Sequence, residues 1–219
     1  MYLDDERAEN IARNVWVKKY KSFNKDRATY DGWMDNFKRA LDKCDTPIID
    51  LGCGNGNNAL HLARMGKEVI ACDYTQQALD LIKENMPEVA STLCFDMRDG
   101  LPFEDNFTDI IIADLSLHYF TENDTFELLK EIKRVLKPSG LLLFRVNSTK
   151  DINWGALDGK EVERNYRRTE EFGDKRYFDS EDLDHFFQEF EFIYKREEIM
   201  KDRYEKPKVL WRCVVCNRK

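Results

Sequence analysis

The amino-acid sequence predicts an α/β fold with a mostly parallel sheet that is covered by helices on both faces. Two observations lead to this prediction. From Pro47 onward, short apolar runs of strand length alternate with amphipathic helical patterns. The runs are apolar throughout, which is typical of strands that are buried on both faces of a parallel sheet.

Five strands and three helices alternate in the centre of the predicted fold. The first strand ends at Asp50 and leads into a glycine-rich turn and a helix that starts near Asn57. Thr75 is expected to cap the second helix, and Thr121 precedes a third helix that runs through Lys137 to a Pro-Ser-Gly stop. The other four strands are predicted at residues 67–73, 91–96, 107–114 and 141–147.

The two ends of the chain differ from this central pattern. The first 45 residues are predicted to form a mostly helical extension rich in aromatic side chains. Residues 148–177 are predicted to form an irregular polar insert with some helix. A helix from Ser180 to Phe190 follows, and then two strands joined by a short turn, at residues 191–199 and 206–216.

Length, composition and charge exclude several classes of protein. A chain of 219 residues can bury a real core, and a hydrophobic content of 42% is too high for a disordered chain. No apolar run approaches the roughly 20 residues of a membrane span, and the acidic N-terminus lacks the apolar stretch of a signal peptide. The six cysteines are expected to be buried free thiols, so we expect a cytoplasmic protein. The net charge of −7 argues against a nucleic-acid partner.

The acid that precedes the glycine turn narrows the choice of ligand. The dinucleotide fingerprint G-x-G-x-x-G would need a glycine at position 57, where this chain has Asn57. The chain instead reads Asp-x-Gly-x-Gly-x-Gly from Asp50 to Gly56. An acid at this place repels a pyrophosphate and suits a ligand that carries an ammonium or a sulfonium group.

On this motif the chain resembles the class I S-adenosylmethionine-dependent methyltransferases, whose first motif has the same form. The resemblance covers residues 46–147 firmly and the C-terminal hairpin more loosely. It implies a Rossmann-like three-layer sandwich with a mostly parallel seven-stranded sheet and a C-terminal antiparallel hairpin. It also implies S-adenosyl-L-methionine as the cofactor and S-adenosyl-L-homocysteine as its product. We expect one methyltransferase domain over residues 1–219, with a lid or extension (1–45), a cofactor-binding core (46–147) and an insert with the C-terminal helix and hairpin (148–219).

Aspartates follow the predicted strands at the edge where open α/β sheets bind ligands. The resemblance implies that Asp50 orients the amino group of the cofactor and that Asp73 accepts both ribose hydroxyls. Tyr74 would then lie against the adenine face. Asp96 would accept from the exocyclic amine of adenine, and the backbone of Met97 would bond the neighbouring ring nitrogen.

The methionine end of the cofactor is assigned by the same resemblance. Backbone groups near Asp114 and Leu115 would close the site around it. Trp16, Tyr20 and Trp33 could form a lid over the cofactor, with plain core packing as the alternative. The turn that would lie against the methionine part of the cofactor contains Gly52, Cys53, Gly54 and Gly56. Its glycines allow the backbone to approach the cofactor closely.

Methyl transfer is an in-line displacement, so alignment and exclusion of water can supply much of the catalysis. A thiolate acceptor needs no base, whereas an oxygen or neutral amine acceptor can need one. His118 is the histidine best placed to be that base, and a packing or capping role is the open alternative. The segment 114–120 lacks the Asn/Asp-Pro-Pro-Tyr motif of enzymes that methylate nucleic-acid or glutamine amines, which disfavours those acceptors.

The acceptor is expected to be a small molecule bound by the variable parts of the chain. The stretch Phe144-Arg-Val-Asn-Ser, together with later aromatic and basic residues, is faintly similar to methyltransferases of the tellurite-resistance and thiopurine type. Five polar residues could bind an anionic acceptor, although most of them are expected on the solvated surface: Arg145, Asn147, Arg167, Arg168 and Arg176.

Three alternatives remain open at this point. The chain could be a protein or RNA methyltransferase, or a catalytically silent protein that only binds S-adenosylmethionine. A nicotinamide-dependent reductase is disfavoured by Asn57 and by the terminal hairpin. No metal site is expected, because Cys213 and Cys216 lie three apart on a strand and point to opposite faces.

Overall fold

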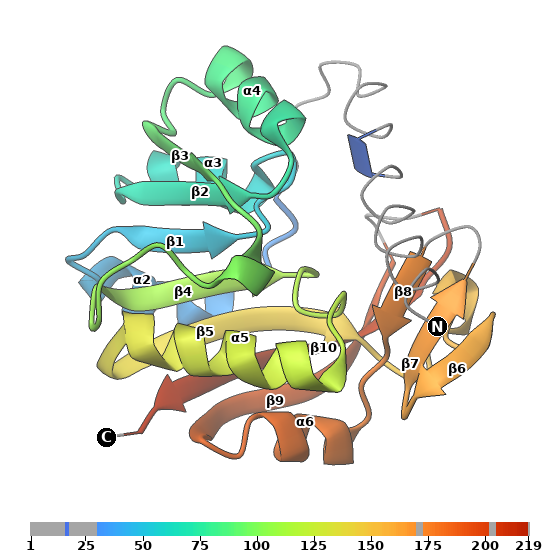
Figure 1. The fold of residues 1–219 in the computed structure, drawn as a ribbon. Coiled ribbons are helices and arrows are strands. Elements are labelled where there is room, and N and C mark those ends of the chain that lie inside the picture. The colour runs from blue at the N-terminus through green and yellow to red at the C-terminus, as the bar shows by residue number, and fades with distance from the viewer. Residues whose placement is uncertain (1–15, 18–29, 170–172, 202–204, 219) are drawn as a thin grey trace.

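The computed structural model describes residues 16–17, 30–169, 173–201 and 205–218, and its centre is a seven-stranded sheet (Figure 1). The strand order is β3-β2-β1-β4-β5-β10-β9. Neighbouring strands from β3 to β5 are parallel, and β10 is antiparallel to both β5 and β9. The strands are β1 (Ile48–Leu51), β2 (Val69–Asp73), β3 (Ser91–Cys94), β4 (Thr108–Asp114), β5 (Leu136–Asn147), β9 (Phe190–Met200) and β10 (Lys208–Asn217).

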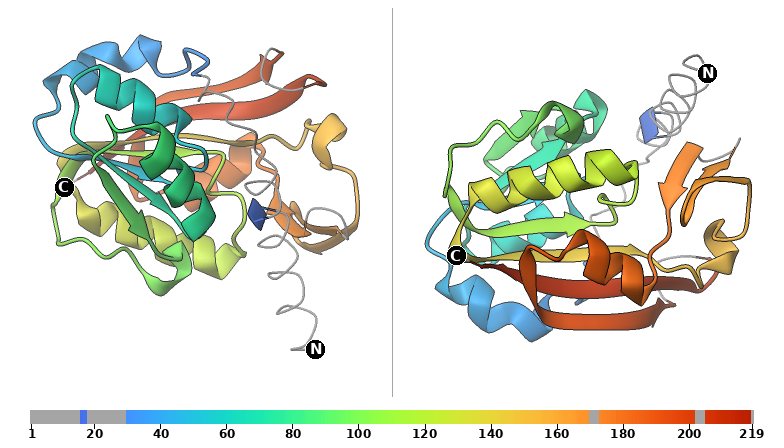
Figure 2. Two further views of the ribbon diagram at one scale, coloured as in Figure 1. Left: turned by 90° about the horizontal axis from the view of Figure 1, so that it is seen from above. Right: turned by 60° about the horizontal axis from the view of Figure 1, so that its bottom comes forward.

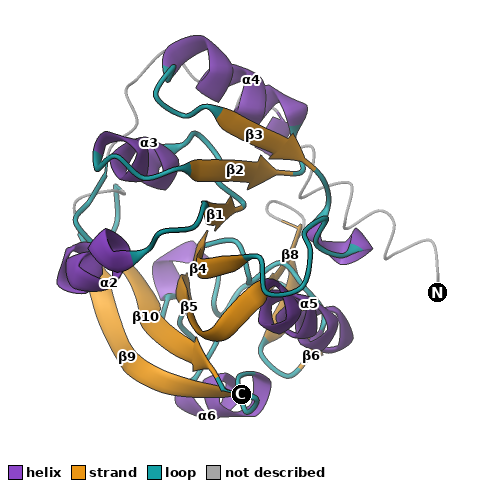
Figure 3. Ribbon diagram, turned by 90° about the vertical axis from the view of Figure 1, so that its left-hand side faces the viewer, coloured by secondary structure: helices purple, strands orange, loops and turns teal. Residues whose placement is uncertain are grey.

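Helices cover both faces of this sheet and form the outer layers of a three-layer sandwich (Figures 2 and 3). One buried cluster joins α5 (Glu122–Val135) and α6 (Ser180–Phe186) to one face of the strands. A second cluster joins the opposite face to α2 (Lys38–Lys43), α3 (Asn57–Arg64) and α4 (Gln76–Asn85). Apolar strand residues alternate between the two clusters, as the twofold period of a strand requires: Ile49 and Ile111 face one side, Ile48 and Ile110 the other.

The predicted central strands and helices are confirmed, with differences at their ends. The third strand ends at Cys94, two residues earlier than expected. Helix α5 ends at Val135, and β5 begins directly after it rather than at residue 141. Helix α6 ends at Phe186 and not at Phe190 as predicted, and Phe190 is the first residue of β9.

The two threonines predicted at helix starts behave differently. Thr121 is the N-cap of α5, and its hydroxyl accepts a hydrogen bond from the Asp124 amide. Thr75 occupies the N-cap position of α4 but does not cap it. Its hydroxyl instead donates to the Asp73 carboxylate over 2.6 Å. The expectation that the Thr75 side chain caps α4 was therefore wrong, because its hydroxyl is directed at the Asp73 carboxylate and accepts from no amide of the first turn.

The prediction of an irregular insert at residues 148–177 was also wrong. After the short 3-10 helix η3 (Ile152–Trp154), the chain forms a separate antiparallel sheet beyond the carboxyl ends of the central strands (Figure 1). The apolar alternation of a half-buried strand is missing here, and ion pairs such as Arg168 with Asp174 link the strands instead. The three strands are β6 (Lys160–Glu163), β7 (Tyr166–Thr169) and β8 (Gly173–Arg176).

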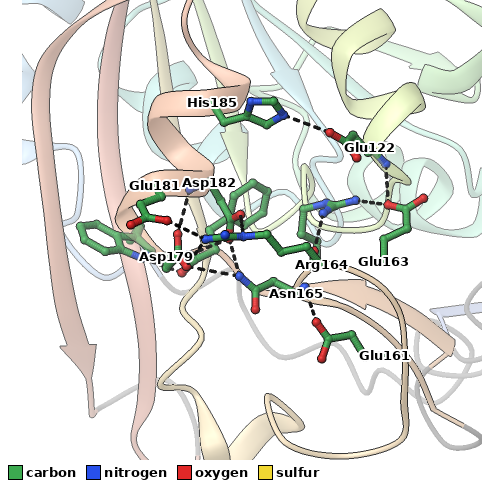
Figure 4. A network of polar contacts seen from close by, with 12 residues as sticks. Glu122, Glu161, Glu163, Arg164, Asn165, Asp179, Glu181, Asp182 and His185 are labelled. Carbon is green, nitrogen blue, oxygen red and sulfur yellow. Dashed lines mark hydrogen bonds and ion pairs between the residues drawn. The ribbon is translucent and has the colours of Figure 1, made fainter.

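A polar network fastens this small sheet to α5 and α6 (Figure 4). Arg164 lies in the turn after β6 and binds acidic side chains at the start of α6, including Asp179 at 2.8 Å and Asp182 at 3.0 Å. Glu163 accepts from the Glu122 amide at the start of α5 and from the Arg176 guanidinium. The small sheet is thereby fixed relative to the main sheet.

Candidate functional site

The structure brings the predicted acids to one edge of the main sheet. Asp73 and Asp114 are the last residues of β2 and β4, and Asp50 is the last but one of β1. Asp96 follows the end of β3 by two residues and caps the 3-10 helix η2 (Met97–Asp99). The four strands are adjacent in the order β3-β2-β1-β4, so the acids form one row at their carboxyl ends.

The glycine turn after β1 has a backbone that side chains would disturb. Gly52, Gly54 and Gly56 all have positive φ, at 70°, 54° and 81°. A Cβ on Gly52 would lie 2.4 Å from the Cβ of Ser116, in the loop after β4. A Cβ on Gly56 would lie 2.8 Å from the sulfur of Met86. Each of these two glycines is thus required both by its φ and by a close neighbour.

Asp73 ties the glycine turn to the end of β2. Its Oδ2 accepts a hydrogen bond from the Gly54 amide at 3.0 Å, and its Oδ1 accepts from the amide and hydroxyl of Thr75. Burial raises the pKa of the Asp73 carboxyl, and these hydrogen bonds oppose the rise. Tyr74, which follows, is half-buried.

Asp96 is oriented by a neighbour in its own turn. Its carboxylate accepts from the Arg98 amide at 3.0 Å and from the Arg98 guanidinium at 3.1 and 2.7 Å. Met97 between them is half-buried and packs against the core cluster that includes α5. The predicted adenine side of the site therefore lies on a turn that an ion pair holds in shape.

Asp114 forms a buried ion pair that the sequence did not reveal. Nε and Nη2 of Arg145 donate to its two carboxylate oxygens at 2.6 and 2.8 Å, and both side chains are 4% exposed. Leu115 follows at a φ of 57°, and its amide donates to the Arg145 carbonyl. The expectation of a solvated surface was wrong for Arg145, Asn147 and Arg176, which are all buried. The sequence carries no signal for the burial of Arg145, because the register that sets it opposite Asp114 follows from the fold.

His118 lies in the loop after β4 and is buried, with 2% of its surface exposed. Its ring centroid lies 4.4 Å from that of Tyr119, and Nδ1 has no hydrogen-bond partner among the described residues. Burial lowers the pKa of His118 well below its ordinary value of 6.5, and Lys175 and Lys208 lower it further. The imidazole is therefore neutral at neutral pH.

The remaining predicted residues lie on both sides of this edge. Trp16 is half-buried, and its ring meets that of Tyr119 edge to face at 6.4 Å, so it adjoins the loop that carries His118. Tyr20 lies outside the described residues. Cys53 is buried in the glycine turn, and burial followed by the charge of Asp50 raises the pKa of its thiol.

Part of the chain matches a known family of proteins. Residues 49–144 match the family described as a methyltransferase domain. Residues 49–144, which are less than half of the chain, are therefore similar to a methyltransferase domain, and the chain has the fold of such enzymes. The predicted resemblance to methyltransferases is thereby confirmed over this stretch.

Two curated relatives match the methyltransferase domain over part of their length. The putative methyltransferase YqeM of Bacillus subtilis is 35% identical over 125 residues, which are 56% of this chain and 50% of that protein. The biotin biosynthesis bifunctional protein BioHC of Cellvibrio japonicus is 34% identical over 144 residues, which are 60% of this chain and 28% of that protein. The chain thus spans half or less of the length of these two relatives.

Solved structures confirm the predicted Rossmann-like fold. A methyltransferase of Methanosarcina mazei superposes with a TM-score of 0.72 at 19% identity, over 83% of this chain and 97% of that one. TehB of Haemophilus influenzae superposes with a TM-score of 0.66 at 16% identity, over 88% and 64%. The 1,6-didemethyltoxoflavin-N1-methyltransferase of Burkholderia thailandensis, with its substrate and S-adenosylhomocysteine bound, gives 0.71 at 15% identity, over 98% and 91%. At such identities the likeness shows the fold alone.

The described residues contain neither a helix able to span a membrane nor a cluster of metal-ligating side chains. None of the helices in the described ranges has the length and apolar character needed to cross a membrane. In the same part of the chain, no three His, Cys, Asp or Glu side chains come together as metal ligands.

We predict that Gly52→Ala destabilises the fold more than Gly66→Ala. Gly66 has a φ of +79° and open space around its Cβ position, so its substitution costs only left-handed strain, about 1–2 kcal/mol. Gly52→Ala adds the collision with Ser116, which should cost about 1–3 kcal/mol more. Urea unfolding of both variants measures the difference, and equal losses would contradict the close approach.

We also predict that His118 makes stability depend on pH below 6.5. There the unfolded chain binds a proton at His118 and the folded chain does not, so stability falls as the pH is lowered. The slope from this one group is at most about 1.4 kcal/mol per pH unit. Unfolding free energies at about pH 7 and about pH 5.5 should therefore differ less in His118→Gln than in the parent protein. Identical differences would show that the buried ring does not resist protonation.

Proposed function

We propose that this protein transfers a methyl group from S-adenosylmethionine to a small-molecule acceptor. The observation that carries the proposal is the row of aspartates around a glycine turn at the carboxyl edge of β3, β2, β1 and β4. Such a row suits a cationic ligand with hydroxyl and amine donors and opposes a pyrophosphate. The family match of residues 49–144 supports the same cofactor.

The residues at this edge fit the cofactor. The backbone at Gly52 and Gly54 has no side chain to keep a ligand away from the turn. Each carboxylate oxygen accepts two hydrogen bonds, and Oδ1 of Asp73 already accepts two from Thr75. We therefore assign one ribose hydroxyl rather than both to Asp73, at Oδ2 beside the Gly54 amide. We assign Tyr74 to the adenine face and Asp50 to the amino group.

The remaining contacts of the cofactor are assigned to the neighbouring turns. Asp96 would accept from the adenine amine while its ion pair with Arg98 keeps it in place. The Met97 backbone would bond the adjacent ring nitrogen. Backbone groups at Asp114 and Leu115, next to the glycine turn, would line the methionine end, where Cys53 contributes its main chain.

The cofactor supplies an electrophilic methyl group on a sulfonium, and the chain supplies alignment, dryness and a base. His118 is neutral and so has a lone pair for a proton from an oxygen or amine acceptor as the methyl group arrives, but the burial that lowers its pKa also makes it a weaker base. A thiolate acceptor would leave this function unused. Trp16 and Tyr119, in edge-to-face contact beside His118, would help to exclude water.

A small acceptor is favoured by what surrounds His118. The Arg176 amide of β8 donates to the His118 carbonyl at 2.8 Å, so the small sheet adjoins the loop and limits the space there. The Burkholderia relative in fold acts on a small heterocycle. The small sheet is bound to α5 and α6, which supports one domain over residues 1–219. All six cysteines are free thiols, and on this ground we place the reaction in the cytoplasm.

A screen with radiolabelled cofactor tests the function directly. The protein is incubated with separate small-molecule, protein and RNA fractions, and release of S-adenosylhomocysteine is measured together with the label. Label in the small-molecule fraction supports the proposal. Label in protein or RNA would show that the acceptor is a macromolecule and not a small molecule. Binding of the cofactor with no transfer to any fraction would indicate a protein that binds the cofactor without catalysis.

We predict that Asp73→Asn weakens binding of S-adenosylhomocysteine. Loss of a charge-assisted hydrogen bond to the ribose should cost about 1–3 kcal/mol. Thr75→Val is the matched control, because it removes a hydrogen bond to Asp73 but leaves the carboxylate charged. Calorimetry measures both affinities, and equal affinity of Asp73→Asn and the parent would exclude the ribose assignment.

We predict that His118→Gln keeps the affinity for S-adenosylhomocysteine and lowers kcat for oxygen or amine acceptors by about 10²–10⁴-fold. His185→Gln is the control, because His185 is exposed on α6 and binds Glu122. Steady-state kinetics at saturating cofactor provide the measurement. An unchanged kcat with such an acceptor would remove the base from the mechanism.

A further inference from the structure

We propose that a charge cluster around the buried Arg145 couples the segment before η1 (Asp35–Phe37) to the cofactor site, with Asp31 and Arg145 as positioning residues for cofactor binding. The cluster consists of Asp31, Arg145 and Asp114, and the segment, residues 30–34, is called the N-terminal anchor. The inference rests on one part of the proposed function, which is that the row of aspartates binds the cofactor.

Arg145 is shared between two carboxylates from distant parts of the chain. Its Nε and Nη2 bind Asp114 at the end of β4, and its Nη1 donates to Oδ2 of Asp31 at 2.8 Å. The exposed fractions of the side chains are 4% for Arg145, 4% for Asp114 and 19% for Asp31. Burial alone would lower the pKa of Arg145, but the two carboxylates raise it above its ordinary value. The guanidinium therefore stays charged and needs both partners.

Trp33 joins the N-terminal anchor to the helix that starts at the glycine turn. The Arg145 guanidinium lies over the Trp33 ring, 4.7 Å from its centroid. The Trp33 indole donates to Oδ1 of Asn58 at 2.9 Å, and Nδ2 of Asn58 lies 3.4 Å from Oδ2 of Asp114. Asn58 is the second residue of α3, directly after the turn that ends at Gly56.

Three segments at the proposed cofactor site are therefore linked to the N-terminal anchor. These are the start of α3, the end of β4 and the end of β5, which also accepts the Leu115 amide through the Arg145 carbonyl. Removing the charge of Asp31 leaves Nη1 of Arg145 without its carboxylate, on a side chain that is only 4% exposed. We expect Arg145 to shift toward Asp114, which would move the Asp114–Leu115 backbone away from the methionine end.

Such coupling is reciprocal. If the N-terminal anchor holds the site in its binding geometry, cofactor binding must in turn hold the anchor more firmly. An ion pair that only stabilised the fold would change the unfolding free energy, but the anchor would not respond to the cofactor. This difference makes the inference testable apart from stability.

The test compares Asp31→Asn with Asp174→Asn in the full chain. Asp174 is the matched control because it also binds an arginine, Arg168, with Nη2 to Oδ2 at 2.8 Å, and its side chain is 12% exposed. Calorimetry gives the dissociation constant for S-adenosylhomocysteine. Hydrogen–deuterium exchange of a peptide covering residues 30–37 is measured with and without that ligand.

We expect S-adenosylhomocysteine to slow exchange at residues 30–37 in the parent and in Asp174→Asn. Asp31→Asn should weaken the affinity by about 5- to 100-fold and abolish the slowing, whereas Asp174→Asn should change the affinity less than about twofold. Asp31→Glu, which restores the charge, should recover part of both effects.

Other outcomes overturn either the inference or the assignment beneath it. Tight binding by the parent with an unchanged dissociation constant in Asp31→Asn would remove the coupling and leave the proposed function standing. Equal losses of affinity in Asp31→Asn and Asp174→Asn would reduce the cluster to a general stabilising contact. Absence of binding by the parent itself would remove the cofactor assignment together with the inference.

Discussion

The hydrogen bond from the Gly54 amide to the Asp73 carboxylate is the contact on which the geometry of the site depends. It joins the turn after β1 to the end of β2. On the other side of β1, Ser116 fills the space beside Gly52 and donates to the Leu51 carbonyl at 2.7 Å. The turn is thus held from both neighbouring strands. Its backbone groups are already ordered in the folded protein, so ligand binding does not carry the entropic cost of ordering them.

The carboxylates in this row would repel one another unless hydrogen-bond donors or cations lay beside them. Asp73 is surrounded by N–H and hydroxyl donors, Asp96 by the guanidinium of Arg98, and Asp114 by that of Arg145. Asp50 is fully buried next to two thiols, Cys53 and Cys72, whose pKa is raised by burial and then by Asp50, so they add no second charge. The charges of Asp73, Asp96 and Asp114 are therefore compensated separately along this edge.

The central part of this fold could be predicted because its signals are local. A β-branched apolar run such as Ile110 to Ile112 favours a buried strand, and Asp50 with the following glycines indicates both a turn and a ligand charge. The small sheet could not be predicted, because its strands are held by ion pairs such as Arg167 with Glu161 rather than by an apolar face. Nor could the burial of Arg145 be predicted, because its partner Asp31 is 114 residues away and leaves no periodic signal.

Strand β9 forms the outer edge of the seven-stranded sheet, and its pairing with β10 is interrupted by a register shift between Val214 and Val215. Ile193 is the extra residue at this bulge and is 59% exposed. A long flat edge with apolar side chains could recruit the same strand of a second copy and grow into aggregates. The bulge increases the local twist, and the charge of Arg196 lies exposed further along the strand. The irregularity thus protects the end of the sheet from self-association while leaving its interior undisturbed.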